Sequence, residues 1–381
     1  MGGRPGSGPS AVYVHIPFCK AKCFYCDFNS YPGLEGLFDD YTKALILEVR
    51  AAEPVGSALK SIYFGGGTPT ILSADALGSI LEALRDRFGL ARDAEITVEA
   101  NPGTVDAPGL SNLRRQGFNR LSIGAQSFDD ATLERIGRIH TADEAREAFA
   151  LGRAAGFDNI SIDLMYALPD QSLSGWQETL RAALGLAPEH ISLYELTVEE
   201  GTAFGNLQQR CQLRLPDEDL QIEMYLSAIR TLASAGYEHY EISNFALPGR
   251  RSAHNQVYWR NEPYFGFGAG ASGYVGGIRY TNVRSPSEYI ESIRTTGRAV
   301  ESAEALTGRR AMGETVMLGI RMLDGLDLAA FKERFGIGIA EAYDGELKAL
   351  AARGLVELTE TRLRLTPAGL LVANEAAAEF V

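Results

Sequence analysis

The stretch "CKAKCFYCDF", residues 19–28, holds three of the four cysteines of this 381-residue chain. Cys19, Cys23 and Cys26 are spaced C-x3-C-x2-C and follow directly on a β-rich run. Thiols grouped so closely are seldom accidental, and unpaired thiols are typical of a reducing compartment. We therefore expect a cytoplasmic protein in which these three side chains share one task.

Three kinds of site are compatible with three such thiols. They are unrelated buried cysteines, a zinc site or an iron–sulfur cluster. Structural zinc needs four ligands, usually in two separated pairs, and the fourth would have to be His15 or the distant Cys211. A [4Fe–4S] cluster normally takes four thiolates. With three, one iron stays open to an outside molecule, so the spacing favours a cluster that binds a further ligand.

Composition narrows the class of protein. Hydrophobic residues make up 45% and charged residues 22% of the chain, as in ordinary soluble globular proteins. The formal net charge of -13 disfavours nucleic acid as a partner. The chain has no apolar run of about 18 residues, so we expect no transmembrane segment. The polar start, residues 1–10, is expected to be a flexible N-terminal tail.

Short β-rich runs alternate with amphipathic segments over the first half of the chain. This alternation predicts an α/β fold with a parallel sheet. Since six units are visible rather than the eight of a closed barrel, we expect a partial (β/α)6 barrel over residues 11–215. The predicted strands are 11–16, 61–65, 95–100, 120–125, 160–166 and 190–196, and the predicted helices between them are 38–53, 73–88, 141–156 and 172–186.

The alternation of β-rich runs and amphipathic segments ends after residue 215. Residues 216–304 are expected to form a mixed α+β extension, with helices at 216–235 and near 286–296 around an aromatic and glycine-rich stretch. Residues 305–381 suggest a winged-helix-like domain with three helices, two short strands and a last helix capped near Thr366. This segment has nine Lys and Arg against eleven Asp and Glu, so it has no basic face for nucleic acid.

The cysteine motif resembles that of the radical SAM superfamily, whose open iron binds the amino and carboxylate groups of S-adenosylmethionine (SAM). The loop "GGGTP" (65–69) follows the second strand, where this superfamily places glycines against the methionine end of SAM. Other strings narrow the resemblance to the oxygen-independent coproporphyrinogen III oxidase-like group, and it covers nearly the whole chain. These strings are "YVHIPFC" (13–19), "VEANPGT" (98–104), "GAQSF" (124–128) and "IDLMYALP" (162–169).

The resemblance implies a set of residues that bind the cofactor. Glu99, Gln126 and Asp163 also lie near the carboxyl ends of predicted strands, where barrel enzymes build their sites. The alternatives are that each of these caps the next helix and that Arg138 is a solvated surface charge. The expected cofactor-binding residues are Tyr13, Tyr25, Gly66, Gly67, Thr68, Glu99, Gln126, Arg138 and Asp163.

Two functions occur within this group. The oxidase has a further cysteine two residues after its last ligand and a long N-terminal extension. Here Phe28 occupies that position and Cys19 lies near the start of the chain, which is similar to the HemW-type haem chaperones. We therefore expect a haem chaperone that carries a [4Fe–4S] cluster and SAM, lacks oxidase activity, and passes haem to acceptor proteins, membrane respiratory enzymes among them. The alternative is an oxygen-independent coproporphyrinogen III oxidase.

The string "HNQVYW" (254–259) matches a pattern associated with those chaperones. Histidine is a common axial ligand of haem, so we expect His254 to bind haem iron, with Tyr258 and Trp259 against the porphyrin. The alternative is a polar turn followed by core aromatics. The nearby glycines of 268–273 formally match a dinucleotide fingerprint but lack its βαβ unit, and we expect them to form a surface beside a flat ligand.

Overall fold

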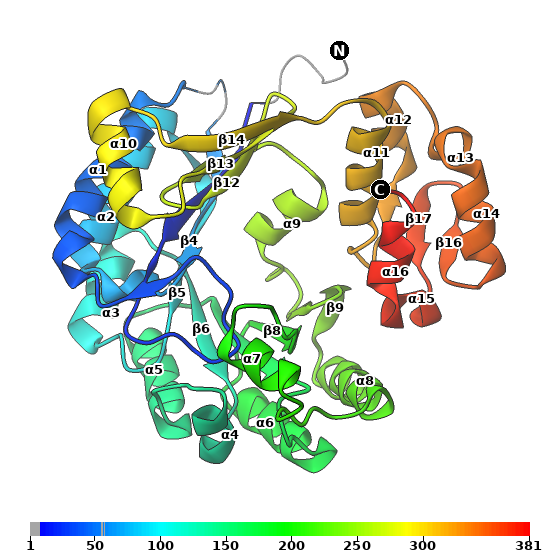
Figure 1. Ribbon diagram of the computed structural model, residues 1–381, viewed down its shortest axis with the longest axis horizontal. Coiled ribbons are helices and arrows are strands. Elements are labelled where there is room, and N and C mark those ends of the chain that lie inside the picture. The colour runs from blue at the N-terminus through cyan, green and yellow to red at the C-terminus, as the bar shows by residue number, and fades with distance from the viewer. Residues whose placement is uncertain (1–7, 55, 57) are drawn as a thin grey trace.

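The structure is a computed structural model that describes residues 8–54, 56 and 58–381. Its centre is a parallel sheet whose strands follow one another in chain order (Figure 1). The sheet has two free edges, so the barrel is open, and the expected partial barrel is confirmed. The six central strands are β1 (Ala11–Ile16), β4 (Leu59–Gly66), β5 (Leu90–Ala100), β6 (Arg120–Gln126), β7 (Ile160–Tyr166) and β8 (His190–Glu195).

Amphipathic helices cover the outer face of this sheet. Two of the predicted starts are fixed by side-chain caps: Ser73 accepts from the backbone of Ala76, and Thr141 forms a capping box with Glu144. The buried faces of the helices and strands form one continuous hydrophobic core. The outer helices are α1 (Phe38–Ala51), α2 (Ala74–Phe88), α3 (Ala107–Gln116), α4 (Asp130–Arg135), α5 (Ala142–Ala154) and α6 (Leu173–Gly185).

The cysteine stretch forms a loop above the carboxyl end of β1. Two short strands bracket it, because Phe18 pairs with Tyr31 and Cys19 with Pro32. Of the expected N-terminal tail, residues 1–7 lie outside the described residues. Residues 9 and 10 already belong to the fold, because Pro9 is buried and the Ser10 carbonyl accepts from the Lys60 N–H. The short elements near this loop are β2 (Phe18–Cys19), β3 (Tyr31–Pro32), η1 (Glu35–Leu37) and η2 (Pro69–Ile71).

The extension lengthens the sheet at both edges. Strand β11 adds to β1 in parallel, and the hairpins after it and the strands beyond β8 are antiparallel. The glycine-rich stretch is part of this ribbon: a Cβ at Gly273 would lie 2.4 Å from the Tyr280 ring, so glycine is needed for strand packing. The expected glycine surface beside a flat ligand is therefore wrong. The strands are β9 (Glu238–Glu241), β10 (Asn244–Ala246), β11 (Tyr264–Phe267), β12 (Ser272–Val275), β13 (Ile278–Asn282) and β14 (Val300–Ala305).

Helix α9 (Ala253–Trp259) lies between the sheet and the C-terminal module rather than on the outer face (Figure 1). Its first turn is held by the Glu95 carboxylate of β5, which accepts from the N–H groups of Ala253 and His254 at 3.1 Å each. A carboxylate at this end also complements the helix dipole. The other helices of this region are α7 (Ala203–Gln209), α8 (Glu218–Ser234) and α10 (Pro286–Thr296).

The C-terminal module has its own hydrophobic core, formed by residues such as Val316, Phe331 and Leu363. Its helices and three-stranded sheet have the arrangement expected of a winged-helix-like domain. No helix within the described ranges is both long and apolar enough to cross a membrane. The elements are α11 (Gly308–Gly319), β15 (Leu326–Asp327), α12 (Leu328–Phe335), α13 (Ile339–Ala342), α14 (Asp344–Ala352), β16 (Val356–Leu358), β17 (Arg362–Leu365), α15 (Pro367–Leu371) and α16 (Ala373–Ala378).

Polar contacts fasten this module to the open side of the barrel. Glu241 of β9 forms a β-bridge with Met322, just after α11. Arg251 pairs with Asp324 at 2.6 Å, and α11 contacts α9, so the module is attached next to β9 and α9. The ion pair is partly exposed, so we attribute the docking chiefly to the buried contacts around it.

Candidate functional site

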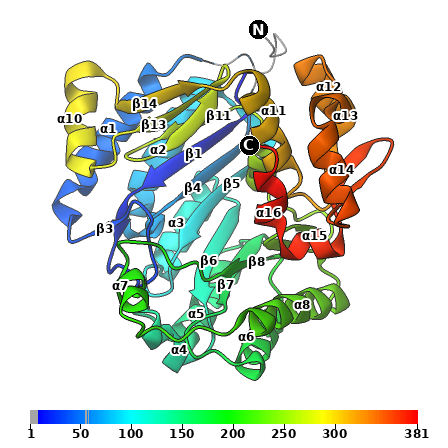
Figure 2. The same ribbon diagram turned by 45° about the vertical axis from the view of Figure 1, so that its right-hand side comes forward.

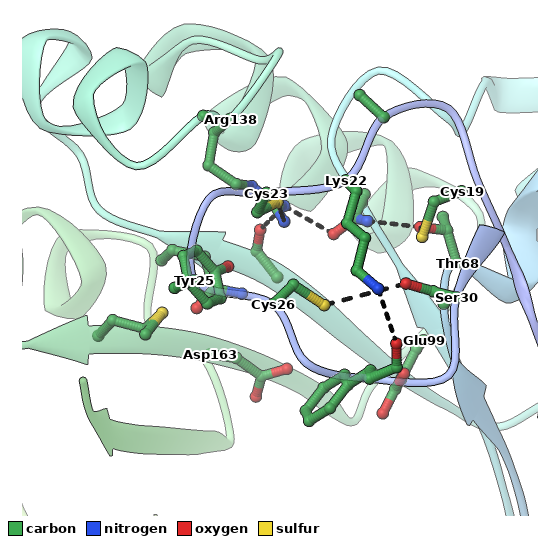
Figure 3. Close-up of a pocket in the computed structure, with 18 of the residues that line it drawn as sticks. Cys19, Lys22, Cys23, Tyr25, Cys26, Ser30, Thr68, Glu99, Arg138 and Asp163 are labelled. Carbon is green, nitrogen blue, oxygen red and sulfur yellow. Dashed lines mark hydrogen bonds between the residues drawn. The ribbon is translucent and has the colours of Figure 1, made fainter. Parts of the chain in front are cut away.

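A cavity of about 490 Å³ lies where the carboxyl ends of β4 to β8 meet the cysteine loop (Figure 3). The structure brings almost all of the predicted site residues to it, and only Tyr13 and His254 do not line it. This follows from the parallel sheet, since the carboxyl ends of its strands share one edge. The predicted residues that line the cavity are Cys19, Cys23, Tyr25, Cys26, Gly66, Gly67, Thr68, Glu99, Gln126, Arg138 and Asp163.

Each of the three loop cysteines is unpaired and has a hydrogen-bond partner of its own. The Thr68 hydroxyl lies 3.5 Å from the Cys19 sulfur and the Ser30 hydroxyl 3.9 Å from the Cys26 sulfur. Burial raises the pKa of both thiols. Binding to a metal or a cluster favours the thiolate form despite this burial. Hydroxyl donors around the sulfur are typical of such ligands.

No group of three or more His, Cys, Asp or Glu side chains in the described part of the chain converges on a single metal ion. The three sulfurs instead surround a wider space on one loop (Figure 3). A four-iron cluster is much larger than one ion, so its ligands need not meet at a point. The donor set therefore suits a [4Fe–4S] cluster better than a structural zinc ion.

The glycine loop lies so close to the cysteine loop that side chains would not fit. A Cβ at Gly67 would lie 2.5 Å from the Phe18 carbonyl and 3.0 Å from the Cys19 sulfur. The N–H groups of Gly67 and Thr68 already donate to Ile16 and Phe18. These two N–H groups are therefore used within the fold, whereas backbone carbonyl oxygens of such a loop suit an ammonium group.

Two carboxylates lie at the floor of the cavity. Glu99 accepts from the Tyr63 hydroxyl at 2.7 Å and from the Gly66 N–H at 3.2 Å. Burial nevertheless raises the pKa of Glu99 to about 7. Asp163 accepts from the Ser122 hydroxyl at 3.0 Å, and burial raises its pKa as well. Neither carboxylate caps a helix, because the helices after β5 and β7 have Asp106 and Ser172 as their caps.

Gln126 has an unusual backbone and an unused acceptor. Its φ is +63°, in the left-handed region that residues with a Cβ rarely occupy. Its side-chain carbonyl oxygen is buried, and no donor among the described residues reaches it. An unpaired buried acceptor costs about 1–3 kcal/mol. A ligand that donates a hydrogen bond would therefore satisfy this atom.

Arg138 is a half-buried part of the cavity wall and not the solvated surface charge of the alternative interpretation. Its guanidinium donates to Asn101 and to the Gly124 carbonyl, both at 2.6 Å, and to the Cys23 sulfur at 3.6 Å. Although burial opposes the charge, neighbouring Tyr25 and Cys23 raise the Arg138 pKa. Sequence analysis missed Asn101 as a partner, although it lies within the quoted string 98–104.

Tyr13 lies on β1 just outside the cavity wall. Its hydroxyl donates to Nδ1 of His15, whose Nε2–H donates to the Asn29 carbonyl at the end of the cysteine loop. A carbonyl only accepts, which fixes the proton of His15 on Nε2. Tyr13 thus supports the cysteine loop through His15 and does not itself reach the cavity.

His254 is buried inside the barrel, far from an accessible haem site. It is 1% exposed, and its ring nitrogens pair with Ser61 at 3.0 Å and Tyr258 at 2.9 Å. Burial lowers the His254 pKa to about 3. The ring has no nitrogen left for iron in this conformation. The axial role therefore stays a prediction, and it requires α9 to move out of the barrel.

Two family models match the chain. The radical SAM superfamily matches residues 13–183, and the HemN C-terminal domain matches residues 306–372. The open parallel barrel, the three-cysteine loop above its strand ends and the C-terminal module thus define a radical SAM protein of the HemN type. A [4Fe–4S] cluster and SAM are what this superfamily implies.

Curated relatives narrow the class further. "Heme chaperone HemW" of Bacillus subtilis is 40% identical over 374 residues, which cover 97% of this chain and 99% of that protein. "Heme chaperone HemW" of Escherichia coli is 38% identical over 375 residues, which cover 96% of each chain. The chain belongs to the HemW heme chaperone family.

A solved structure shows the same architecture. Coproporphyrinogen III oxidase (HemN) from Escherichia coli, a radical SAM enzyme, matches with a TM-score of 0.85 at 25% identity. The match covers 98% of this chain and 90% of that chain. The identity is lower than the 38% shared with HemW of the same organism. The fold is thus common to both groups, and the sequence is more similar to the chaperone.

Proposed function

We propose that this protein is a haem chaperone, which binds haem and passes it to acceptor proteins, and that it carries a three-cysteine [4Fe–4S] cluster and SAM. The observation that carries the proposal is the match to HemW chaperones over nearly the full length of both chains. The acceptor class is haem proteins that must be loaded after synthesis, membrane respiratory enzymes among them.

Cys19, Cys23 and Cys26 would hold the cluster through their thiolates. When bound, such a cluster supplies an electron and one open iron at which SAM coordinates. SAM would then extend along the glycine loop, where backbone carbonyls meet its ammonium group. Gln126 would accept a hydrogen bond, and Glu99 and Asp163 would face its hydroxyl groups or its sulfonium charge. The remaining lining residues of the proposal are Tyr25, Gly66, Gly67, Thr68 and Arg138.

Phe28 favours the chaperone over the oxidase. It occupies the position of the oxidase's additional cysteine, lines the cavity mouth, and is 63% exposed. A phenyl ring there is no ligand for a cluster or a second cofactor. The second candidate function is nevertheless the oxidative decarboxylation of coproporphyrinogen III, because the whole fold matches HemN at a TM-score of 0.85.

The two functions are separated by product analysis. The protein is reconstituted anaerobically with iron and sulfide and incubated with coproporphyrinogen III, SAM and a reductant. The chaperone function predicts unchanged coproporphyrinogen. In parallel, haem-loaded protein is mixed with an apo-haem protein, and the function predicts transfer of the haem. A vinyl product that depends on SAM, or haem that never leaves the protein, would contradict the proposal.

A further inference from the structure

A second cavity, of about 270 Å³, lies on the other side of α9 from the barrel strands. Its walls come from three helices that are distant in sequence, and Figure 2 shows α11 and α16 side by side at this place. Trp259 is on α9, Met317 is on α11, Arg321 follows the end of α11, and Ala377 and Ala378 are on α16. We call this cavity the tryptophan slot. Because α16 contributes alanines, the slot stays open.

Two nitrogen donors in the tryptophan slot have no acceptor. Arg321 lies with its guanidinium carbon 4.4 Å above the Trp259 ring, and both the Arg321 Nε and the Trp259 Nε1 are buried. No acceptor among the described residues pairs with either nitrogen. Since unpaired buried donors are unfavourable, an acceptor supplied by a ligand would satisfy these two nitrogens.

The negatively charged neighbour of Arg321 is Glu241, and the two side chains do not form a hydrogen bond. The Glu241 carboxylate lies 3.8 Å from the Arg321 Nη2, which is too far for a hydrogen bond. Its other oxygen accepts from Asn244 and from the Ser243 N–H. The Arg321 Nε therefore has no acceptor among the residues that the structure describes, and the Glu241 oxygen nearest to Arg321 is also unpaired there, in a slot whose remaining walls are apolar except for Asn374.

A ligand for this slot needs an apolar, flat body and a carboxylate at its edge. The apolar side chains that line the slot suit a flat hydrophobic body, and the N–H donors of Trp259 and Arg321 suit a carboxylate. Haem combines both, because its hydrophobic macrocycle carries two propionates on one side. The slot is too small for the whole macrocycle. If one edge of haem lies in the slot and the rest of the macrocycle stays exposed, the haem can still be released to an acceptor.

We propose that the tryptophan slot receives one propionate-bearing edge of haem, whose carboxylate accepts from Trp259 Nε1 and Arg321 Nε. The inference rests on the proposed haem-binding function and locates its site. It also divides the motif of residues 254–259 between two roles. His254 and Tyr258 face the barrel and hold α9 in place, whereas Trp259 faces the slot.

The test compares haemin with haemin dimethyl ester, whose propionates are blocked, by titration of the Soret band on the full chain. The wild-type protein should bind haemin at least about tenfold more tightly than the ester, because a charge-assisted hydrogen bond is lost. Arg321→Gln and the slot-filling Ala377→Leu should each weaken haemin binding by about tenfold. Arg321→Gln should also abolish the difference between haemin and the ester.

Two matched controls lie in the same module and away from the slot. Arg364→Gln removes an exposed arginine on β17 that pairs with Glu357 of β16, and Ala351→Leu enlarges an exposed alanine on α14, so both should bind haemin as the wild type does. Equal affinity for haemin and its ester, or unchanged haemin binding in the Arg321 variant, would overturn the slot and leave the chaperone function standing. If the wild-type protein binds no haemin, the proposed function itself fails. The comparison of haemin with its ester needs no substitution, so it tests the proposed slot even if a variant is unstable.

Discussion

Arg138 follows α4 and Cys23 belongs to the cysteine loop, and the guanidinium Nη1 of Arg138 donates to the Cys23 sulfur at 3.6 Å (Figure 3). A positive donor beside a thiolate stabilises the charged form that binds a cluster. The arginine is itself held by Asn101 and by the Gly124 carbonyl. The cysteine loop is thereby connected electrostatically to the strand ends of β5 and β6.

Removal of this donor should weaken the cluster. Arg138→Met is expected to lower cluster affinity by about 10- to 100-fold, as is usual for residues that support metal ligands. The measurement is iron and sulfide content after anaerobic reconstitution and desalting. Arg135→Met is the control, because that arginine is 40% exposed and pairs only with the surface around Asp170. Equal cluster content in both variants would show that Arg138 does not support the cluster.

Gly67→Ala should also disturb cluster assembly, for a steric reason. The added methyl group would lie 2.5 Å from the Phe18 carbonyl and would push the Cys19 side of the loop away. We expect loss of most iron and sulfide, measured as above. Gly36→Ala is the matched control, since a Cβ there meets nothing within 4 Å. An iron content equal to that of the control would mean that the two loops separate easily.

His254→Ala tests whether α9 stays in the barrel. Loss of the ring leaves Ser61 and Tyr258 without their partners and creates a cavity. The free energy of unfolding should fall by about 2–4 kcal/mol. If α9 stays in place, the Soret band of bound haem should be unchanged. A shifted or lost band would show that α9 opens and that His254 is a ligand after all.

Glu48 should give the stability a pH dependence of known sign. It is half-buried and accepts from the Tyr289 hydroxyl, the Gly268 N–H and the Asn282 amide. Burial raises its pKa from 4.5 to about 6. The folded state therefore holds the proton to higher pH than the unfolded state does. This contribution to stability is present below about pH 4.5 and is lost as pH rises through about 6.

The substitution Glu48→Gln isolates that contribution. The difference in the free energy of unfolding between wild type and variant should fall by about 2 kcal/mol from pH 4 to pH 7. Urea unfolding at a series of pH values measures it. A difference that stays constant with pH would show that Glu48 titrates normally in the folded protein.

Local patterns predicted the barrel because its strands and helices alternate in chain order. Strands 11–16 and 160–166 match β1 and β7 residue for residue, and Thr141 caps α5 as expected. The ribbons at the two sheet edges were not predicted. Their strands are short and rich in glycine, and they become strands only by pairing with distant segments such as β1.

The cavity was predictable for the same reason. Glu99 and Gln126 lie at the carboxyl ends of β5 and β6, and Asp163 lies within β7 in the same parallel sheet, so their chain positions already imply one common region. The place of His254 was not predictable. It depends on the hydrogen bonds from the first turn of α9 to Glu95 and on packing against β4. Both are contacts between segments far apart in the chain. A buried histidine and an exposed ligand have the same local sequence.

The central claim is that this chain binds haem while Cys19, Cys23 and Cys26 hold an iron–sulfur cluster. The most direct measurement is a haemin titration, followed by the Soret band, of the anaerobically reconstituted protein and of the variant with all three cysteines replaced by Ala. We expect a saturable Soret band in both proteins, and cluster iron and sulfide only in the first. Cys211→Ala should match the wild type in both respects. Absence of saturable haemin binding in the reconstituted protein, or a full cluster in the triple variant, would contradict the account.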